Sequence, residues 1–105
     1  MAQYAIFTTF TSVPSKAELA GRSEKVRKAL MAQVPSMTGK WVCDYGFEDG
    51  AVNAIDIVEA NNADDVQTAA RIISEQGQCQ TKVARAQRWH EYAQTGVDRK
   101  EVGCD

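Results

Sequence analysis

The sequence lacks an excess of positive charge and any long apolar run, and each absence excludes a class of function. Its 105 residues carry 12 Lys and Arg against 14 Asp and Glu, a formal net charge of −2 at pH 7. This balance gives no electrostatic reason to expect nucleic acid or an anionic membrane surface as a partner. The apolar runs fall far short of the roughly 18 residues that a bilayer-spanning helix needs. Because the N-terminus shows no secretory signal pattern either, a cytoplasmic location is predicted.

Cysteine and proline are also scarce. The three cysteines, Cys43, Cys79 and Cys104, form no C-x-x-C pair, which argues against a disulfide framework and a structural zinc site. We interpret them as reduced thiols. Two prolines and 44% hydrophobic residues indicate a folded chain rather than a disordered one. We expect a single domain over residues 1–94, followed by a polar, flexible tail over residues 95–105.

The residues that are present alternate between strand-like and helix-like patterns. Aromatic and β-branched alternation predicts four strands, at 3–11, 39–47, 51–59 and 78–87. Helical spacing, with Ser15 and Asn61-Asn62 as N-terminal caps and Gly77 as the C′ residue, predicts helices over 16–33 and 61–77. Residues 88–92 either extend the last strand or begin a short helix.

The order of these elements is β-α-β-β-α-β, which predicts an α+β, ferredoxin-like fold. In this fold two right-handed β-α-β units give a four-stranded antiparallel sheet with both helices on one face. The face without helices is expected to present Phe7, Val42, Ala54 and Val58. A face this apolar needs covering, and a twofold copy of the same chain would cover it, so we predict a homodimer.

Four segments carry a family resemblance: YAIFTTFT, GKWVCDYG, AIDIVEANNADDV and KVARA. Together they resemble the dimeric α/β-barrel superfamily, particularly its small GYD-like members. The resemblance implies that a small-molecule ligand lies between the sheet and the helices, or in the barrel formed at the dimer interface. Fold alone does not select one activity among such proteins.

Relatives in this superfamily include cofactor-independent monooxygenases, muconolactone isomerases, haem-degrading enzymes, chlorite-dismutase-like haem proteins and ligand-sensing domains. The haem-degrading relatives combine Asn, Trp and His around their substrate. This chain offers Asn53, Trp41 or Trp89, and His90 for such a set. We expect no cofactor, with haem as the alternative that this part of the resemblance implies.

Asp56 and His90 are the two candidate bases. Asp56 lies between Ile55 and Ile57, so if both isoleucines face the helices, Asp56 faces the dimer barrel, where burial raises its pKa. The alternative is a solvated carboxylate or one paired with Lys82 or Arg85. His90 is the only histidine, and histidine is the residue type most often used as a base near neutral pH; the alternative is a surface residue in a terminal helix.

Alternation places Trp41, Cys43 and Tyr45 on one face of the second strand. If a pocket opens there, Trp41 stacks on a planar substrate, Tyr45 donates a hydrogen bond and Cys43 contacts the ligand. The alternative is that the three residues form core. Arg85 is a candidate for binding a substrate carboxylate, or for a structural ion pair.

Three functional hypotheses follow. The first is a small-molecule enzyme that acts on a planar organic substrate by proton abstraction or cofactor-free oxygenation. The second is a non-catalytic ligand-binding or assembly module of the same fold, which would have no pocket carboxyl group with a shifted pKa. The third is a haem-binding or haem-degrading protein.

Overall fold

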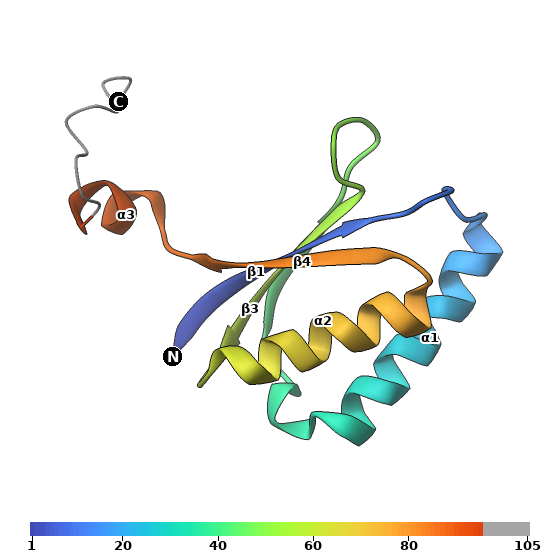
Figure 1. Cartoon of the computed structure of the whole chain (residues 1–105), viewed down its shortest axis with the longest axis horizontal. Helices are drawn as coiled ribbons and strands as arrows, with labels where there is room; N and C mark the ends of the chain where they lie inside the picture. The colour runs from blue at the N-terminus through green and yellow to red at the C-terminus, as the bar shows by residue number, and fades with distance from the viewer. Residues whose placement is uncertain (96–105) are drawn as a thin grey trace.

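A computed structural model describes residues 1–95 (Figure 1). Its elements are β1 (Ala2–Thr9), α1 (Lys16–Gln33), the 3-10 helix η1 (Pro35–Met37), β2 (Trp41–Gly46), β3 (Ala54–Ala60), α2 (Ala63–Gly77), β4 (Gln80–Ala86) and α3 (Trp89–Thr95). The predicted order of strands and helices is confirmed, and the ambiguous segment after the last strand forms helix α3. Apart from Thr95, the predicted tail lies outside the described residues, as does Cys104.

The sheet has the strand order β2-β3-β1-β4, and every neighbouring pair is antiparallel. Helices α1 and α2 lie together on one face, whereas α3 lies away from them beyond the end of β4 (Figure 1). The predicted ferredoxin-like α+β fold is therefore confirmed. Strands β1 and β3 occupy the centre of the sheet, so their side chains are the best placed to form a site on either face.

Both long helices begin at the predicted caps. The Glu18 amide donates to Ser15 Oγ at 3.2 Å, and the Ser15 amide donates to Glu18 Oε1 at 2.9 Å, which completes a capping box. The Asp65 amide donates to Asn62 Oδ1 at 2.9 Å. These bonds satisfy amides that have no partner inside a helix, and so they fix where α1 and α2 start.

The end of α2 differs from the prediction. Gln78, and not Gly77, adopts the left-handed conformation, with φ of 53°. Gly77 is buried because the chain packs closely there: a Cβ atom on it would lie 3.3 Å from Cys79 Sγ. The glycine at this position thus allows a close approach between the end of α2 and the chain that enters β4.

Helix α1 stands away from the sheet. It packs mainly against α2, and none of its residues is buried. In contrast, α2 buries five residues against the sheet and α1: Val66, Ala69, Ala70, Ile72 and Gly77. Since α1 makes little contact with the strands, space remains between α1 and the half of the sheet that α2 does not cover.

The predicted faces of β3 are wrong. Val58 pairs with Tyr4 and Asp56 pairs with Ile6, and these positions face the helices, with Val58 and Ile6 completely buried. Ile55 and Ile57 therefore lie on the open face. Alternation could not decide which side of β3 faces the helices, because apolar residues occupy both the even-numbered and the odd-numbered positions of this strand. Asp56 thus faces the helices and not a dimer barrel.

The predicted common face of Trp41, Cys43 and Tyr45 is wrong as well. The register of β2 shifts between Trp41 and Cys43, which pair with Val58 and Ile57 respectively. Trp41 faces the helices, the side opposite the one predicted for Val42, whereas the β-bulge puts Cys43 and Tyr45 on the open face. The three side chains predicted to share a face are separated by the sheet.

The open face carries two rows of paired side chains that cross all four strands. The first row contains Tyr45, Ile55, Phe7 and Lys82, and the second contains Cys43, Ile57, Ala5 and Ala84. Only Phe7 of the four residues expected there lies in these rows, since Ala54 and Val58 face the helices and Val42 sits at the bulge. Even so, six of the eight residues in the rows are Ile, Phe, Ala or Cys, so the face is strongly apolar.

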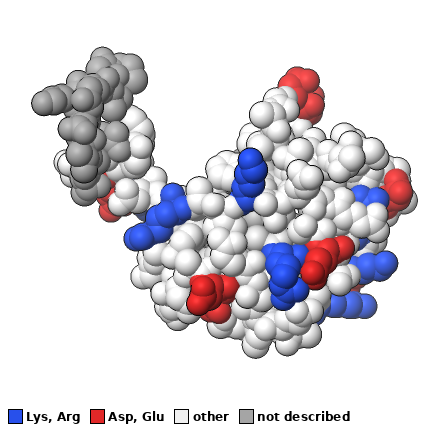
Figure 2. All heavy atoms as spheres, in the orientation of Figure 1, with Lys and Arg blue, Asp and Glu red and all other residues white. Residues whose placement is uncertain are grey.

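Charges are spread over the surface. On the face drawn in Figure 2, Lys and Arg alternate with Asp and Glu, and no broad area of one sign is present. Among residues 1–95, no helix combines the length and the apolar character needed to cross a membrane.

Candidate functional site

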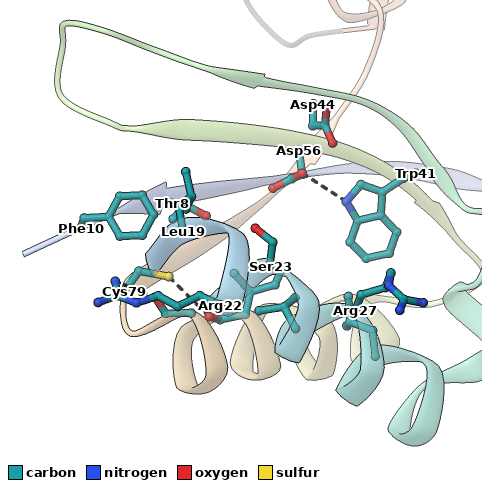
Figure 3. Close-up of a pocket in the computed structure, with 14 residues that line it drawn as sticks. Thr8, Phe10, Leu19, Arg22, Ser23, Arg27, Trp41, Asp44, Asp56 and Cys79 are labelled. Carbon is teal, nitrogen blue, oxygen red and sulfur yellow. Dashed lines mark hydrogen bonds between the residues drawn. The ribbon is translucent and has the colours of Figure 1, made fainter. Parts of the chain in front are cut away.

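A cavity of about 380 Å³ lies between α1 and the sheet (Figure 3). It is lined by Thr8, Phe10, Leu19, Arg22, Ser23, Val26, Arg27, Leu30, Trp41, Asp44, Asp56, Ile73, Gly77 and Cys79. Its volume falls within the range of sites for small organic ligands, about 300–1,000 Å³, and its lining combines apolar walls with a few polar groups. The cavity exists because α1 stands away from the sheet.

Asp56 is the central polar group of the sheet wall. Trp41 Nε1 donates a hydrogen bond to Asp56 Oδ1 at 3.2 Å (Figure 3). Burial raises the pKa of the Asp56 carboxyl group above its ordinary value. The Trp41 hydrogen bond opposes this rise, and the negative charge of Asp44 adds to it. Asp56 is thus a carboxyl group whose proton affinity is increased inside a cavity.

Asp44 forms the second carboxyl group of this wall. It pairs directly with Asp56 across β2 and β3, so both side chains lie on the helix-facing side. Asp44 is exposed, while Asp56 is half-buried. The two acidic groups therefore extend from the interior of the cavity to its solvent-exposed edge.

The wall opposite the acids comes from α1 and carries basic and hydroxyl groups. Arg22, Ser23 and Arg27 line the cavity from this helix (Figure 3). Arg22 Nη1 donates to the Gly77 carbonyl at 3.5 Å, which holds its guanidinium at the end of α2. Arg22 Nη2 also lies 3.8 Å from Glu18 Oε2, and Arg27 donates to Glu24 through Nε at 3.3 Å and through Nη2 at 2.5 Å. The guanidinium of Arg27 is therefore already paired, and Arg22 is the cation that the α1 wall offers to a ligand.

Cys79 closes the end of the cavity near Arg22. Its Sγ donates to the Ile73 carbonyl at 3.4 Å, and burial raises the pKa of the thiol while the Arg22 charge lowers it. A thiol with a raised pKa is a poor nucleophile near neutral pH. We therefore interpret Cys79 as a wall residue.

Of the six residues singled out from the sequence, two line this cavity, Asp56 and Trp41. Cys43 and Tyr45 lie on the other side of the sheet. The alternative partners of Asp56, Lys82 and Arg85, are both on β4, which β1 separates from β3. The structure thus brings together a predicted base and a predicted stacking wall but not the predicted hydrogen-bond donor.

The other two predicted residues lie elsewhere. His90 is exposed on α3, and the Arg85 guanidinium lies over the Tyr4 ring, 6.0 Å from its centroid. Asn53 Oδ1 accepts a hydrogen bond from the Phe10 amide at 2.8 Å, outside the cavity. The Asn, Trp and His set of haem-degrading relatives is therefore not gathered around this cavity. In the described part of the chain, no three His, Cys, Asp or Glu residues are grouped to hold a metal ion.

Sequence reasoning missed the residues that α1 contributes. Leu19, Arg22, Ser23, Val26, Arg27 and Leu30 share helical spacing of i, i+3, i+4, i+7, i+8 and i+11. The apolar members, Leu19, Val26 and Leu30, are the ones that helical spacing alone predicts to pack inward. The polar residues of the same stripe, Arg22, Ser23 and Arg27, could have indicated a site, because a helix face that only packs against the core is mainly apolar.

Comparison with known proteins identifies the fold. No protein-family model matches the sequence, and no curated protein matches it. The structure is similar to that of 5-chloro-2-hydroxyhydroquinone dehydrochlorinase (TftG) from Burkholderia phenoliruptrix AC1100, in complex with 2,5-dihydroxybenzoquinone. The TM-score is 0.51 at 17% sequence identity, over 85% of this chain and 97% of that chain. At this identity the similarity shows the fold alone.

Proposed function

We propose that this protein is a small-molecule enzyme that abstracts a proton from a planar organic substrate, with Asp56 as the general base. The observation that carries the proposal is the position of Asp56: a carboxyl group with a raised pKa, in a cavity of suitable size, held by an indole N–H. A base works best when its pKa approaches the working pH, so the raised pKa suits this role.

In the proposed reaction, the substrate reacts as the keto tautomer of a hydroxylated ring, and the ionised Asp56 carboxylate takes a proton from its tetrahedral carbon next to a carbonyl group. The electron pair of that C–H bond stays on the substrate and delocalises into the adjacent carbonyl group, which gives an enolate. Arg22 on the opposite wall stabilises the negative charge. Protonated Asp56 then returns its proton to another position of the enolate, or Asp44 passes it to solvent. Cofactor-free oxygenation would begin with the same deprotonation and would differ by consuming oxygen.

Trp41 serves two purposes in this proposal. Its N–H donor fixes the orientation of the Asp56 carboxylate, and its ring forms a flat wall against which a planar substrate stacks. TftG, whose fold is similar, is described in complex with a planar hydroxylated quinone. Compounds of this class are therefore the first substrates to test.

The proposal differs from the alternative of a pure binding module in a specific observation. A module that only holds a ligand has no need of a carboxyl group with a shifted pKa in its pocket, whereas Asp56 is such a group. The resemblance to the small GYD-like members of the superfamily stays a prediction from the sequence and adds no further residue to the site.

Deuterium exchange tests the proposal. The protein is mixed in D₂O with 2,5-dihydroxybenzoquinone and a panel of related planar hydroxylated rings, and loss of ring C–H signals is followed by ¹H NMR. We expect exchange above the uncatalysed rate for at least one ring, and its loss in Asp56→Asn. Exchange that is equal in the two proteins would contradict the role of Asp56. Ring binding without any exchange would favour the binding module.

We also propose that the open face of the sheet packs against a second copy of the chain. Its two apolar rows leave Ile55, Ile57 and Phe7 on a face that none of the described helices covers. Lys82 and the exposed Tyr45 lie at the two ends of one row, with the apolar residues between them. A twofold interface on this face would therefore have an apolar centre and a polar rim. The mass of the protein in solution, measured by light scattering, is expected to be that of two chains.

A further inference from the structure

A second cavity continues the candidate site on the other side of Trp41. It has a volume of about 260 Å³ and is lined in part by Met31, Val34, Met37 and Thr38. Arg27, Leu30 and Trp41 line both this cavity and the cavity that contains Asp56. Because three residues on two elements are shared, the two spaces meet between Trp41 and helix α1.

The two cavities differ in chemistry. The first has carboxyl groups on the sheet and guanidinium and hydroxyl groups on α1, whereas the second is lined by Leu30, Met31, Val34, Met37 and the Trp41 ring, with Thr38 and Arg27 at its borders. The unbranched side chain of Met31 is 53% exposed and can adjust to an apolar group placed beside it. The one charged residue of this lining, Arg27, is already paired with Glu24 and donates to Met31 Sδ at 3.4 Å, so the cavity favours an apolar group over a charged one.

From this arrangement we infer that the ligand has two parts: a planar polar ring, bound beside Asp56, and an apolar alkyl or aryl substituent, bound beyond Trp41. The substrate class is thus a hydroxylated ring with an apolar side chain rather than a bare ring. The inference rests on the proposed function for the placement of the ring. Trp41 lies at the junction, so its indole contacts the ring on one side and the substituent on the other.

A homologous ligand series tests the inference. Dissociation constants are measured by calorimetry for 2,5-dihydroxybenzoquinone and its 3-ethyl, 3-butyl and 3-hexyl derivatives. Each methylene group that enters the second cavity is expected to tighten binding by up to about 4-fold, until the cavity is filled. Equal affinity for all members of the series would overturn the inference while leaving the ring site, and with it the proposed function, in place.

Two variants of α1 give a matched comparison. Met31→Glu puts a charge in the second cavity, whereas Ala32→Glu adds the same charge at an exposed neighbouring position that lines neither cavity. We expect Met31→Glu to remove the dependence on chain length and to leave the affinity for the unsubstituted ring unchanged. Ala32→Glu should behave like the parent protein. An unchanged chain-length dependence in Met31→Glu would contradict the inference.

The methionine methyl groups locate the substituent directly. The sequence has three methionines, and Met31 and Met37 line the second cavity while Met1 is 68% exposed at the N-terminus. In protein labelled with ¹³C at the methionine methyl groups, the 3-hexyl compound should shift the Met31 and Met37 signals and leave Met1 unchanged. The unsubstituted ring should move neither. If no member of the series binds, the inference and the proposed function both fail.

Discussion

The two faces of the sheet offer different surfaces to a ligand. The helix side carries Asp56 and Trp41 in a cavity, because α1 packs on α2 and stands away from the strands. The open side carries flat apolar rows centred on Ile55 and Ile57. Concave surfaces with a few polar groups suit small molecules, whereas flat apolar surfaces suit protein partners. Under the proposed function, chemistry takes place on the helix side and assembly on the open side, and the following changes test that division.

The largest effect is expected at the base. Asp56→Asn keeps the size of the side chain and removes its ability to accept a proton, so proton exchange into a substrate ring should fall by roughly 100-fold or more. Ring binding, measured by calorimetry, should persist because Trp41 and the α1 wall are unchanged. An Asp56→Asn protein with full activity would show that the chemistry does not take place on the helix side.

The next effect concerns the open face alone. Ile57→Lys places two like charges in a twofold interface, so the dimer dissociation constant should rise by at least about 100-fold. Light scattering across a dilution series measures it, and Val42→Lys, at the exposed bulge outside the apolar rows, is the control. Because the cavity lies on the other face, ligand affinity should change little. Loss of both dimer and ligand binding would mean that the faces are not independent.

A smaller effect is expected for Trp41→Phe. The ring wall remains, but Asp56 loses its indole donor, and a hydrogen bond to a charged group is worth about 1.5–3 kcal/mol. Turnover should fall by roughly 10-fold or more. Because this hydrogen bond lowers the pKa of Asp56, its removal should move the acid limb of the activity profile to higher pH. A limb that moves to lower pH would contradict the assigned role.

Asp44→Asn should have the opposite and smallest effect on that profile. The negative charge of Asp44 raises the pKa of Asp56, so neutralising it should lower that pKa and move the acid limb to lower pH. Glu48→Gln, which removes a charge in the exposed loop outside this cavity, is the control. If both variants shift the profile equally, the coupling of Asp44 and Asp56 is not specific.

The raised pKa of Asp56 also makes the free energy of unfolding depend on pH. Because folding raises this pKa, the ionised carboxylate destabilises the folded state, and protonation removes the penalty as the pH falls. The free energy of unfolding of Asp56→Asn, relative to the parent, should therefore increase as pH rises from the ordinary aspartate pKa to the raised one, and then stay constant. Urea unfolding of both proteins across this range measures the difference. A difference that shrinks as pH rises would contradict the raised pKa.

The fold could be predicted from the sequence because its signals are local. The Ser15 and Glu18 capping box, the Asn62 cap and the alternation of β1 each depend on a few neighbouring residues, and tertiary contacts did not override them. The order of the elements then restricts the topology to few choices. The antiparallel sheet and the position of both long helices on one of its faces follow from that restriction.

The site could be predicted only in part because strand faces depend on distant contacts. Asp56 could be singled out as a candidate base, but its face could not be predicted, since β3 is apolar on both sides and only packing against β1 and α2 decides the orientation. The bulge that separates Trp41 from Tyr45 leaves no sequence signal that alternation can detect. Arg22 and Ser23 were overlooked because polar residues on a helix usually face solvent.

The indole signals of the two tryptophans give the most direct test of the central claim that the helix-side cavity is the ligand site. Trp41 lies in the cavity and Trp89 lies on α3, so each reports on a different region. On titration of ¹⁵N-labelled protein with a planar hydroxylated ring that calorimetry shows to bind, the Trp41 Nε1–H signal should shift in a saturable manner and the Trp89 signal should not. A saturable shift of Trp89, or binding that leaves Trp41 unmoved, would contradict the account.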